Sequence, residues 1–100
     1  MDVDPLLALR LEHFTPLVGS EVLMDLGTGW VAARVIAAER IGGHAVREGG
    51  GFSVTLKAPV SGYPAQGTFP VMLPGLDEVG LFMSPRRLED GHAIYEFILN

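Results

Sequence analysis

The sequence contains no cysteine. Disulfide bonds, thiolate metal ligands and a cysteine nucleophile are therefore all excluded. Long hydrophobic runs are also missing, since no apolar stretch approaches the roughly 20 residues that a membrane-spanning helix needs. The first residues carry Asp2 and Asp4 where a signal peptide would be basic. We therefore expect a cytoplasmic protein without a membrane span.

Charge is scarce, and basic charge is scarcest. Only 19% of the residues are charged, the net charge is -5, and the seven basic residues are scattered apart from the pair Arg86 and Arg87. A nucleic-acid partner requires a basic stripe, so none is expected. By contrast, the 48% of hydrophobic residues suffice to offset the entropy lost on folding. Residues 1–100 are expected to form a single domain.

Glycines and prolines divide the chain into short segments, as in a protein of several strands joined by turns. Near the N-terminus, Leu11, Phe14 and Leu17 lie three residues apart, which predicts a short helix over 11–18 that ends at Gly19. Alternating apolar residues predict strands over 21–26, 30–41, 52–58, 68–73, 79–83 and 93–99.

Two of these segments are less regular than the others. Residues 30–41 contain four alanines, which favour helix, but Val31, Ala33, Val35 and Ala37 give one apolar face at period two, which favours a strand. In 68–73, Pro70 cannot donate to a strand ladder and indicates an edge position or a strand start. The resulting fold class is a six-stranded antiparallel barrel or sandwich with a short N-terminal helix.

The last two strands are apolar on both faces. One face carries Val79, Leu81, Met83, Tyr95, Phe97 and Leu99, and the other carries Phe82, Ile94 and Ile98. Either the N-terminal helix covers this second face, or the face is an interface. We therefore take Phe82, Ile94 and Ile98 as candidate interaction residues.

The sequence contains no strong motif for nucleotide binding, metal binding or catalysis. Residues 22–33 read VLMDLGTGWVAA, which imitates a nucleotide-binding glycine loop, but that fold needs βαβ units, so a plain hairpin turn is favoured. The histidines His13, His44 and His92 have no metal-ligand spacing, and no serine lies in a nucleophile elbow. We expect no enzyme activity, no metal and no cofactor.

Three further residues are candidates for contacts with a partner. Arg86 and Arg87, in the predicted loop over 84–92, could bind a phosphate or an acidic partner through bidentate hydrogen bonds, although paired arginines are more often plain surface. Tyr63 lies in a proline-rich stretch and could anchor a partner through its ring.

Several segments together resemble a family of small bacterial domains of unknown function. They include LEHFTPLVGSEVLMDL, FSVTLKAP, QGTFPVMLPGLDEVGLFMSP and YEFILN, with the recurring positions Phe14 to Gly19, Gln66 to Phe69, and Tyr95 with Glu96. The resemblance implies structural roles for these positions, with Tyr95 packing inward. It also implies accessory work in a phage-tail-like assembly, since members are similar to genes near phage-tail-collar-like proteins.

These observations lead to two hypotheses for function. The first is a structural or protein-interaction accessory module that associates with a protein partner or with itself through Phe82, Ile94 and Ile98. The alternative is a small-molecule or lipid binder that uses the interior of a barrel, motivated by the many inward apolar residues.

Overall fold

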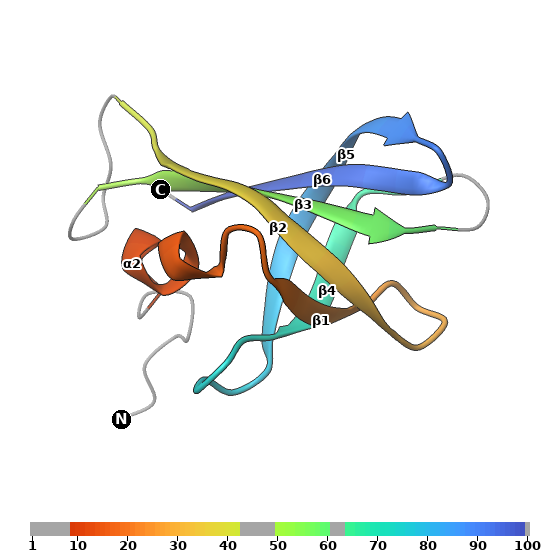
Figure 1. Cartoon of the computed structure of the whole chain (residues 1–100), viewed down its shortest axis with the longest axis horizontal. Helices are drawn as coiled ribbons and strands as arrows, with labels where there is room; N and C mark the ends of the chain where they lie inside the picture. Colours follow the sequence, from red (N-terminus) through yellow and green to blue (C-terminus); the bar gives the residue numbers. More distant parts are fainter. Residues whose placement is uncertain (1–8, 43–49, 61–63, 100) are drawn as a thin grey trace.

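The computed structural model describes residues 9–42, 50–60 and 64–99. Six antiparallel strands close into a barrel in the order β1-β2-β3-β6-β5-β4 (Figure 1). The elements are a helix, α2 (Leu11–Phe14), a 3-10 turn, η1 (Thr15–Leu17), and the strands β1 (Glu21–Asp25), β2 (Trp30–Arg40), β3 (Phe52–Pro59), β4 (Gly67–Met72), β5 (Val79–Glu89) and β6 (His92–Leu99). Of the two architectures predicted from the sequence, the barrel is confirmed and the sandwich is not.

The core fills the barrel interior with every second residue of each strand. In β3 the burial alternates without a fault, as the sequence pattern predicts, and Val54 and Leu56 are fully buried. Tyr95 and Phe97 of β6 also point inward. This alternation follows from strand geometry, because successive side chains emerge on opposite faces of the sheet.

The alanine-rich segment is a strand, and it contains a bulge that the sequence did not reveal. The pairing of β2 with β3 shifts between Val35 and Ala37, so Ile36 is the extra residue. Val35 is fully buried, whereas Ile36 is exposed. Beyond the bulge Ala38 packs against the core instead of Ala37, because one inserted residue reverses the alternation. The predicted inward position of Ala37 is therefore wrong.

Strand β5 is longer than predicted. It continues through Pro85 to Glu89 after an irregularity between Pro85 and Arg87, so the loop predicted over 84–92 shrinks to a tight turn. Asp90 and Gly91 form this turn, with φ of 46° and 78°. Two consecutive positive φ angles are typical of the two-residue hairpin turns that join twisted strands. Arg86 and Arg87 consequently lie on a strand and not in a loop.

The barrel closes along a short seam between β1 and β4. Only two residue pairs join these strands, Leu23 with Met72 and Met24 with Val71, whereas β4 pairs with β5 over five residues. Pro70 pairs with Gly80 of β5 and lies just beyond the end of the seam. The proline is therefore tolerated at a place where, among the described residues, one side of its strand has no ladder partner.

Helix α2 lies across one end of the barrel (Figure 1). Its Phe14 is 1% exposed and packs against the rings of Phe52 and Phe97, with centroids 5.6 and 5.3 Å away. Gly19, with φ of 89°, then turns the chain into β1 as predicted. The helix does not cover the outer face of β5 and β6, since its contacts are with β2, β3 and η1. No helix among the described residues is both long and apolar enough to cross a membrane.

Candidate functional site

The glycine motif that imitates a nucleotide loop forms the turn between β1 and β2. One carboxylate oxygen of Asp25 accepts hydrogen bonds from the backbone N–H groups of Gly27 and Gly29, at 2.7 and 3.2 Å. Both glycines have positive φ, 108° and 123°. The N–H groups that a phosphate would need are thus already bonded within the turn, and the prediction of a plain hairpin is confirmed.

The three predicted interaction residues on the outer face of the last hairpin differ in their exposure to solvent. Phe82 is 58% exposed and Ile98 is 50% exposed, whereas Ile94 is only 1% exposed. Ile94 faces outward between Lys57 and Arg87, and long basic side chains of this kind cover apolar neighbours with their stems. Ile94 therefore differs from Phe82 and Ile98 in being buried on the outer face. Tyr63, the fourth candidate, lies outside the described residues.

Phe82 and Ile98 belong to a wider apolar surface, which we call the uncharged strip. Phe82 pairs with Thr68 of β4, and Ile98 pairs with Ser53 of β3; both lie beyond Ser84 and Glu96, the first pair of the β5–β6 ladder. Leu23 and Met72 are paired across the barrel seam, and each is 44% exposed. The strip comprises the outward residues Leu23 of β1, Thr68, Pro70 and Met72 of β4, Gly80, Phe82 and Ser84 of β5, and Ile98 of β6.

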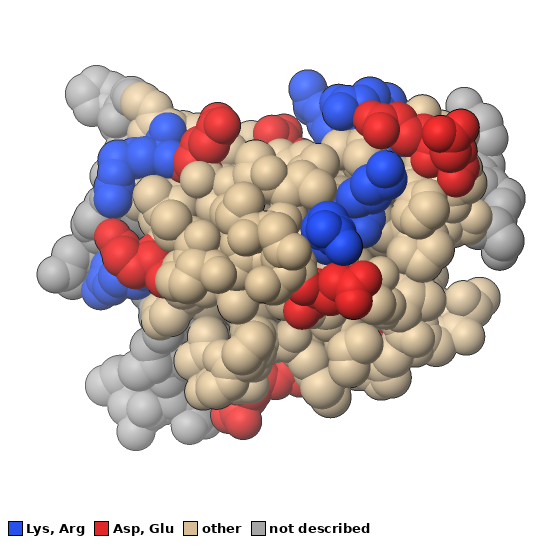
Figure 2. Space-filling model, in the orientation of Figure 1, with Lys and Arg blue, Asp and Glu red and all other residues tan. Residues whose placement is uncertain are grey.

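Charged side chains lie outside the strip and are mixed in sign. Figure 2 shows acidic and basic groups side by side on the face of the barrel that carries β2, with no continuous basic stripe there. Arg86 lies 3.8 Å from a carboxylate oxygen of Glu96, and Arg87 donates to Glu89 at 2.6 Å. This hydrogen bond is the main reason that the pKa of the Glu89 carboxyl falls below its usual value. Both guanidinium groups therefore already have carboxylate partners.

Two of the three histidines have local structural contacts. The backbone N–H of Arg10 donates to Nδ1 of His13 at 2.9 Å, which ties the start of α2. Nδ1 of His92 lies 3.1 Å from the carbonyl oxygen of Asp90 in the β5–β6 turn. Within 9–42, 50–60 and 64–99, no group of three or more potential metal ligands occurs. His44 is not among the described residues.

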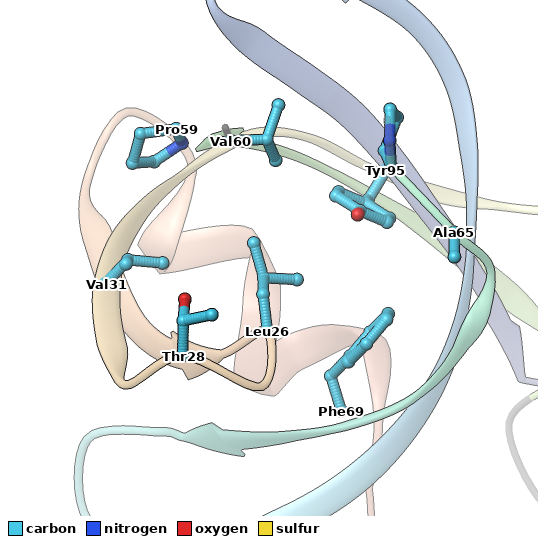
Figure 3. Close-up of a pocket in the computed structure, with 9 residues that line it drawn as sticks. Leu26, Thr28, Val31, Pro59, Val60, Ala65, Phe69 and Tyr95 are labelled. Atoms are coloured by element: carbon cyan, nitrogen blue, oxygen red, sulfur yellow. The ribbon is translucent and has the colours of Figure 1, made fainter. Parts of the chain in front are cut away.

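The end of the barrel opposite α2 is hollow. A pocket of about 450 Å³ opens there between the β1–β2 turn, the end of β3 and the start of β4 (Figure 3). The nine described residues that line it carry no charge: Leu26, Thr28, Val31, Pro59, Val60, Pro64, Ala65, Phe69 and Tyr95. This volume lies within the range of about 300–1,000 Å³ that is typical of small-molecule sites.

Tyr95 forms the inner wall of this pocket. Its side chain is 2% exposed, and its ring meets that of Phe69 edge to face with centroids 5.8 Å apart. Figure 3 shows the hydroxyl directed into the pocket. No hydrogen-bond partner for this hydroxyl occurs in the described part of the chain. Burial raises the pKa of the Tyr95 phenol above its usual value, so the hydroxyl stays protonated.

Sequence reasoning placed Tyr95 inside but did not find the pocket. The pocket residues come from four separate segments of the chain, and only barrel closure brings them together. One sequence signal was available, because Tyr95 is a polar aromatic at an inward position of a strand. A buried phenol usually has a hydrogen-bond partner, so such a position points to a site for one.

A second hollow lies on the outer face of β2 and β3. It is lined by Arg34, Lys57 and His92 together with Glu21 and two uncharged residues. Arg34 pairs across strands with Glu21, and Lys57 lies 3.8 Å from Glu89. The adjacent carboxylates offset the positive charge, so this hollow is a weaker anion site than its basic residues alone suggest.

Comparison with known proteins identifies the family. The model of a family described as "Domain of unknown function (DUF6916)" matches residues 9–99. The chain belongs to this family. The resemblance to a small family of domains of unknown function is thereby confirmed, and the match covers α2 and all six strands of the barrel. No curated protein and no solved structure matches the chain.

Proposed function

We propose that this DUF6916 domain is a non-enzymatic interaction module that associates with a second copy of itself through the uncharged strip. The observation that carries the proposal is the exposure of Phe82 and Ile98, 58% and 50%, together with the absence of charge from the outward residues of β4 and of the first half of β5. Large apolar residues gathered on an exposed face are typical of protein interfaces.

Barrel closure determines how two copies could meet. All six strands have neighbours on both sides, so the sheet offers no free edge strand for pairing with another chain. Association must therefore proceed through outward side chains. A two-fold axis would place the same strip of both copies in contact, as in most soluble homodimers.

The charge distribution favours a second copy as the occupant. The chain carries a net charge of -5, so two copies repel each other in most orientations. The outward positions of β4 and of β5 up to Ser84 bear no charged residue, whereas Glu21, Glu89 and Glu96 lie outside the strip. Contact between two strips keeps Glu21 and Glu89 out of the interface and leaves Glu96, the neighbour of Ser84, at its rim.

Sedimentation velocity over a range of protein concentrations tests this proposal. The native chain should form dimers, and Phe82→Glu should abolish them, because the variant places a carboxylate against its symmetry mate. Leu88→Glu is the matched control, since Leu88 is 54% exposed on the same strand but lies outside the strip. A native chain that stays monomeric, or equal loss of dimers in both variants, would contradict the proposal.

Self-association also supports an accessory role in a larger protein assembly. The sequence resemblance implies such a role in phage-tail-like structures, in which a two-fold dimer would take part as one closed unit. This role depends on the self-association of the domain, so a native chain that stays monomeric would contradict it as well. Circular dichroism of each variant checks that the barrel remains folded.

A further inference from the structure

The pocket at the open end of the barrel combines an apolar wall with a buried polar atom. Leu26, Val60 and Phe69 supply hydrocarbon surface from three different segments of the chain. The ring of Phe69 points from β4 toward the middle of the pocket (Figure 3). Small-molecule sites typically show this composition, with few polar groups among apolar side chains.

The hydroxyl of Tyr95 is the group that a ligand would satisfy. It is buried, directed into the pocket and without a hydrogen-bond partner in the described residues. An unpartnered buried hydroxyl costs free energy, and a ligand oxygen could remove that cost by accepting its proton. Across the pocket, Thr28 offers a second hydroxyl from the β1–β2 turn.

The lining also restricts the charge of the ligand. None of the nine lining residues is ionisable at neutral pH, since Tyr95 keeps its proton. A carboxylate or an ammonium group in the pocket would lose hydration without gaining a counter-charge. The site therefore selects neutral molecules.

We propose that this pocket binds a neutral, compact, largely apolar small molecule whose carbonyl oxygen accepts a hydrogen bond from Tyr95. Its hydrocarbon body packs against Phe69, Leu26 and Val60. An aromatic body fits best, because the existing edge-to-face contact of Phe69 with Tyr95 shows that the wall accommodates rings. The site shares no residue with the uncharged strip, so it is independent of the self-association proposed above.

Three probes of similar shape separate the contributions to binding. Acetophenone has an aromatic body and a carbonyl, ethylbenzene lacks the carbonyl, and benzoate is charged. In NMR titrations of the labelled protein, acetophenone should shift the amide signals of the lining residues in a saturable way. Ethylbenzene should bind about fivefold more weakly, the value of one net hydrogen bond. Benzoate should bind more weakly than ethylbenzene, because its charge must be desolvated.

Variants assign the hydrogen bond and the location. Tyr95→Phe should keep the affinity for ethylbenzene and lower that for acetophenone to the same level. It should also fold at least as stably as the native chain, because no partner of the hydroxyl is lost. Ala65→Phe should fill the pocket and weaken both neutral probes. Ala32→Phe is its matched control, because Ala32 is exposed and outside the pocket.

Three outcomes would overturn the inference. The first is the absence of saturable acetophenone binding, and the second is a set of shifted signals that maps outside the pocket. The third is an unchanged preference for acetophenone over ethylbenzene in Tyr95→Phe. Sedimentation of the same variants is expected to match that of the native chain, so failure of this site and failure of self-association are distinguishable.

Discussion

The two ends of this barrel have the same six strands but different contents. At one end, Phe14 from helix α2 enters the interior and meets Phe52 and Phe97, so three aromatic rings are packed together. At the other end, the rings of Phe69 and Tyr95 meet edge to face and border a pocket of about 450 Å³. The described elements place a helix over the first end and turns around the second.

The difference shows that the strands alone do not decide whether a small barrel is filled. Inward side chains fill the middle of a six-stranded barrel, but at each end the wall continues beyond the last complete ring of side chains. A segment from outside the sheet must then close the end, as α2 does by burying Phe14 to 1% exposure. At the other end, where the described residues supply turns and no helix, a hollow remains.

The largest expected effect on stability comes from removing the Phe14 ring, which fills the α2 end of the barrel. Phe14→Ala should lower the free energy of unfolding by about 3–5 kcal/mol, because it leaves a cavity among well-packed rings. Phe69→Ala at the open end should cost roughly half as much, since Phe69 is only partly buried and already borders empty space. Chemical denaturation of both variants measures the difference. Equal losses would show that the two ends are packed alike.

A smaller effect is expected at the rim of the open end. Asp25→Ala removes the acceptor of the Gly27 and Gly29 N–H groups and should cost about 1–2 kcal/mol. It should also broaden the amide signals of Thr28 and Val31, which line the pocket. Asp77→Ala, in the connection between β4 and β5, is the control and should change stability by less than about 0.5 kcal/mol. A loss as large for Asp77→Ala would contradict the role given to Asp25.

The smallest effect concerns the protonation of Tyr95. In a Tyr63→Phe background, Tyr95 is the only tyrosine, and its phenol should titrate above the ordinary pKa of about 10 because it is buried. The unfolded chain ionises first, so the neutral phenol's contribution to stability is complete below the ordinary pKa and is lost as pH rises through the folded pKa. Absorbance of the phenolate against pH measures this. Titration at the ordinary value would indicate a wetter pocket.

Local sequence patterns predicted most of the elements. Alternation over 52–58 identified β3, the glycines at 27 and 29 identified a hairpin turn, and Gly19 marked the end of the N-terminal helical segment. These features depend on neighbouring residues only, because side-chain alternation and positive φ are properties of the local backbone. The inward position of Tyr95 followed from the same alternation.

The errors arose where a strand departs from a regular period. The bulge at Ile36 moved Ala38 inward in place of Ala37, and the irregularity near Arg86 extended β5 into the predicted loop. No glycine stands next to either irregularity to mark the change. Ile94 was placed correctly on the outer face, but its burial depends on the side chains of neighbouring strands.

The sequence by itself determined the type, number and alternation of the strands, since these are set by the order of side chains along the chain. Only the tertiary structure decided that the sheet closes, that α2 fills one end, and that the other end holds a pocket facing the Tyr95 hydroxyl. These features bring together residues far apart in the sequence, and such contacts depend on the register of every strand at once. No local pattern encodes the combined register of all six strands.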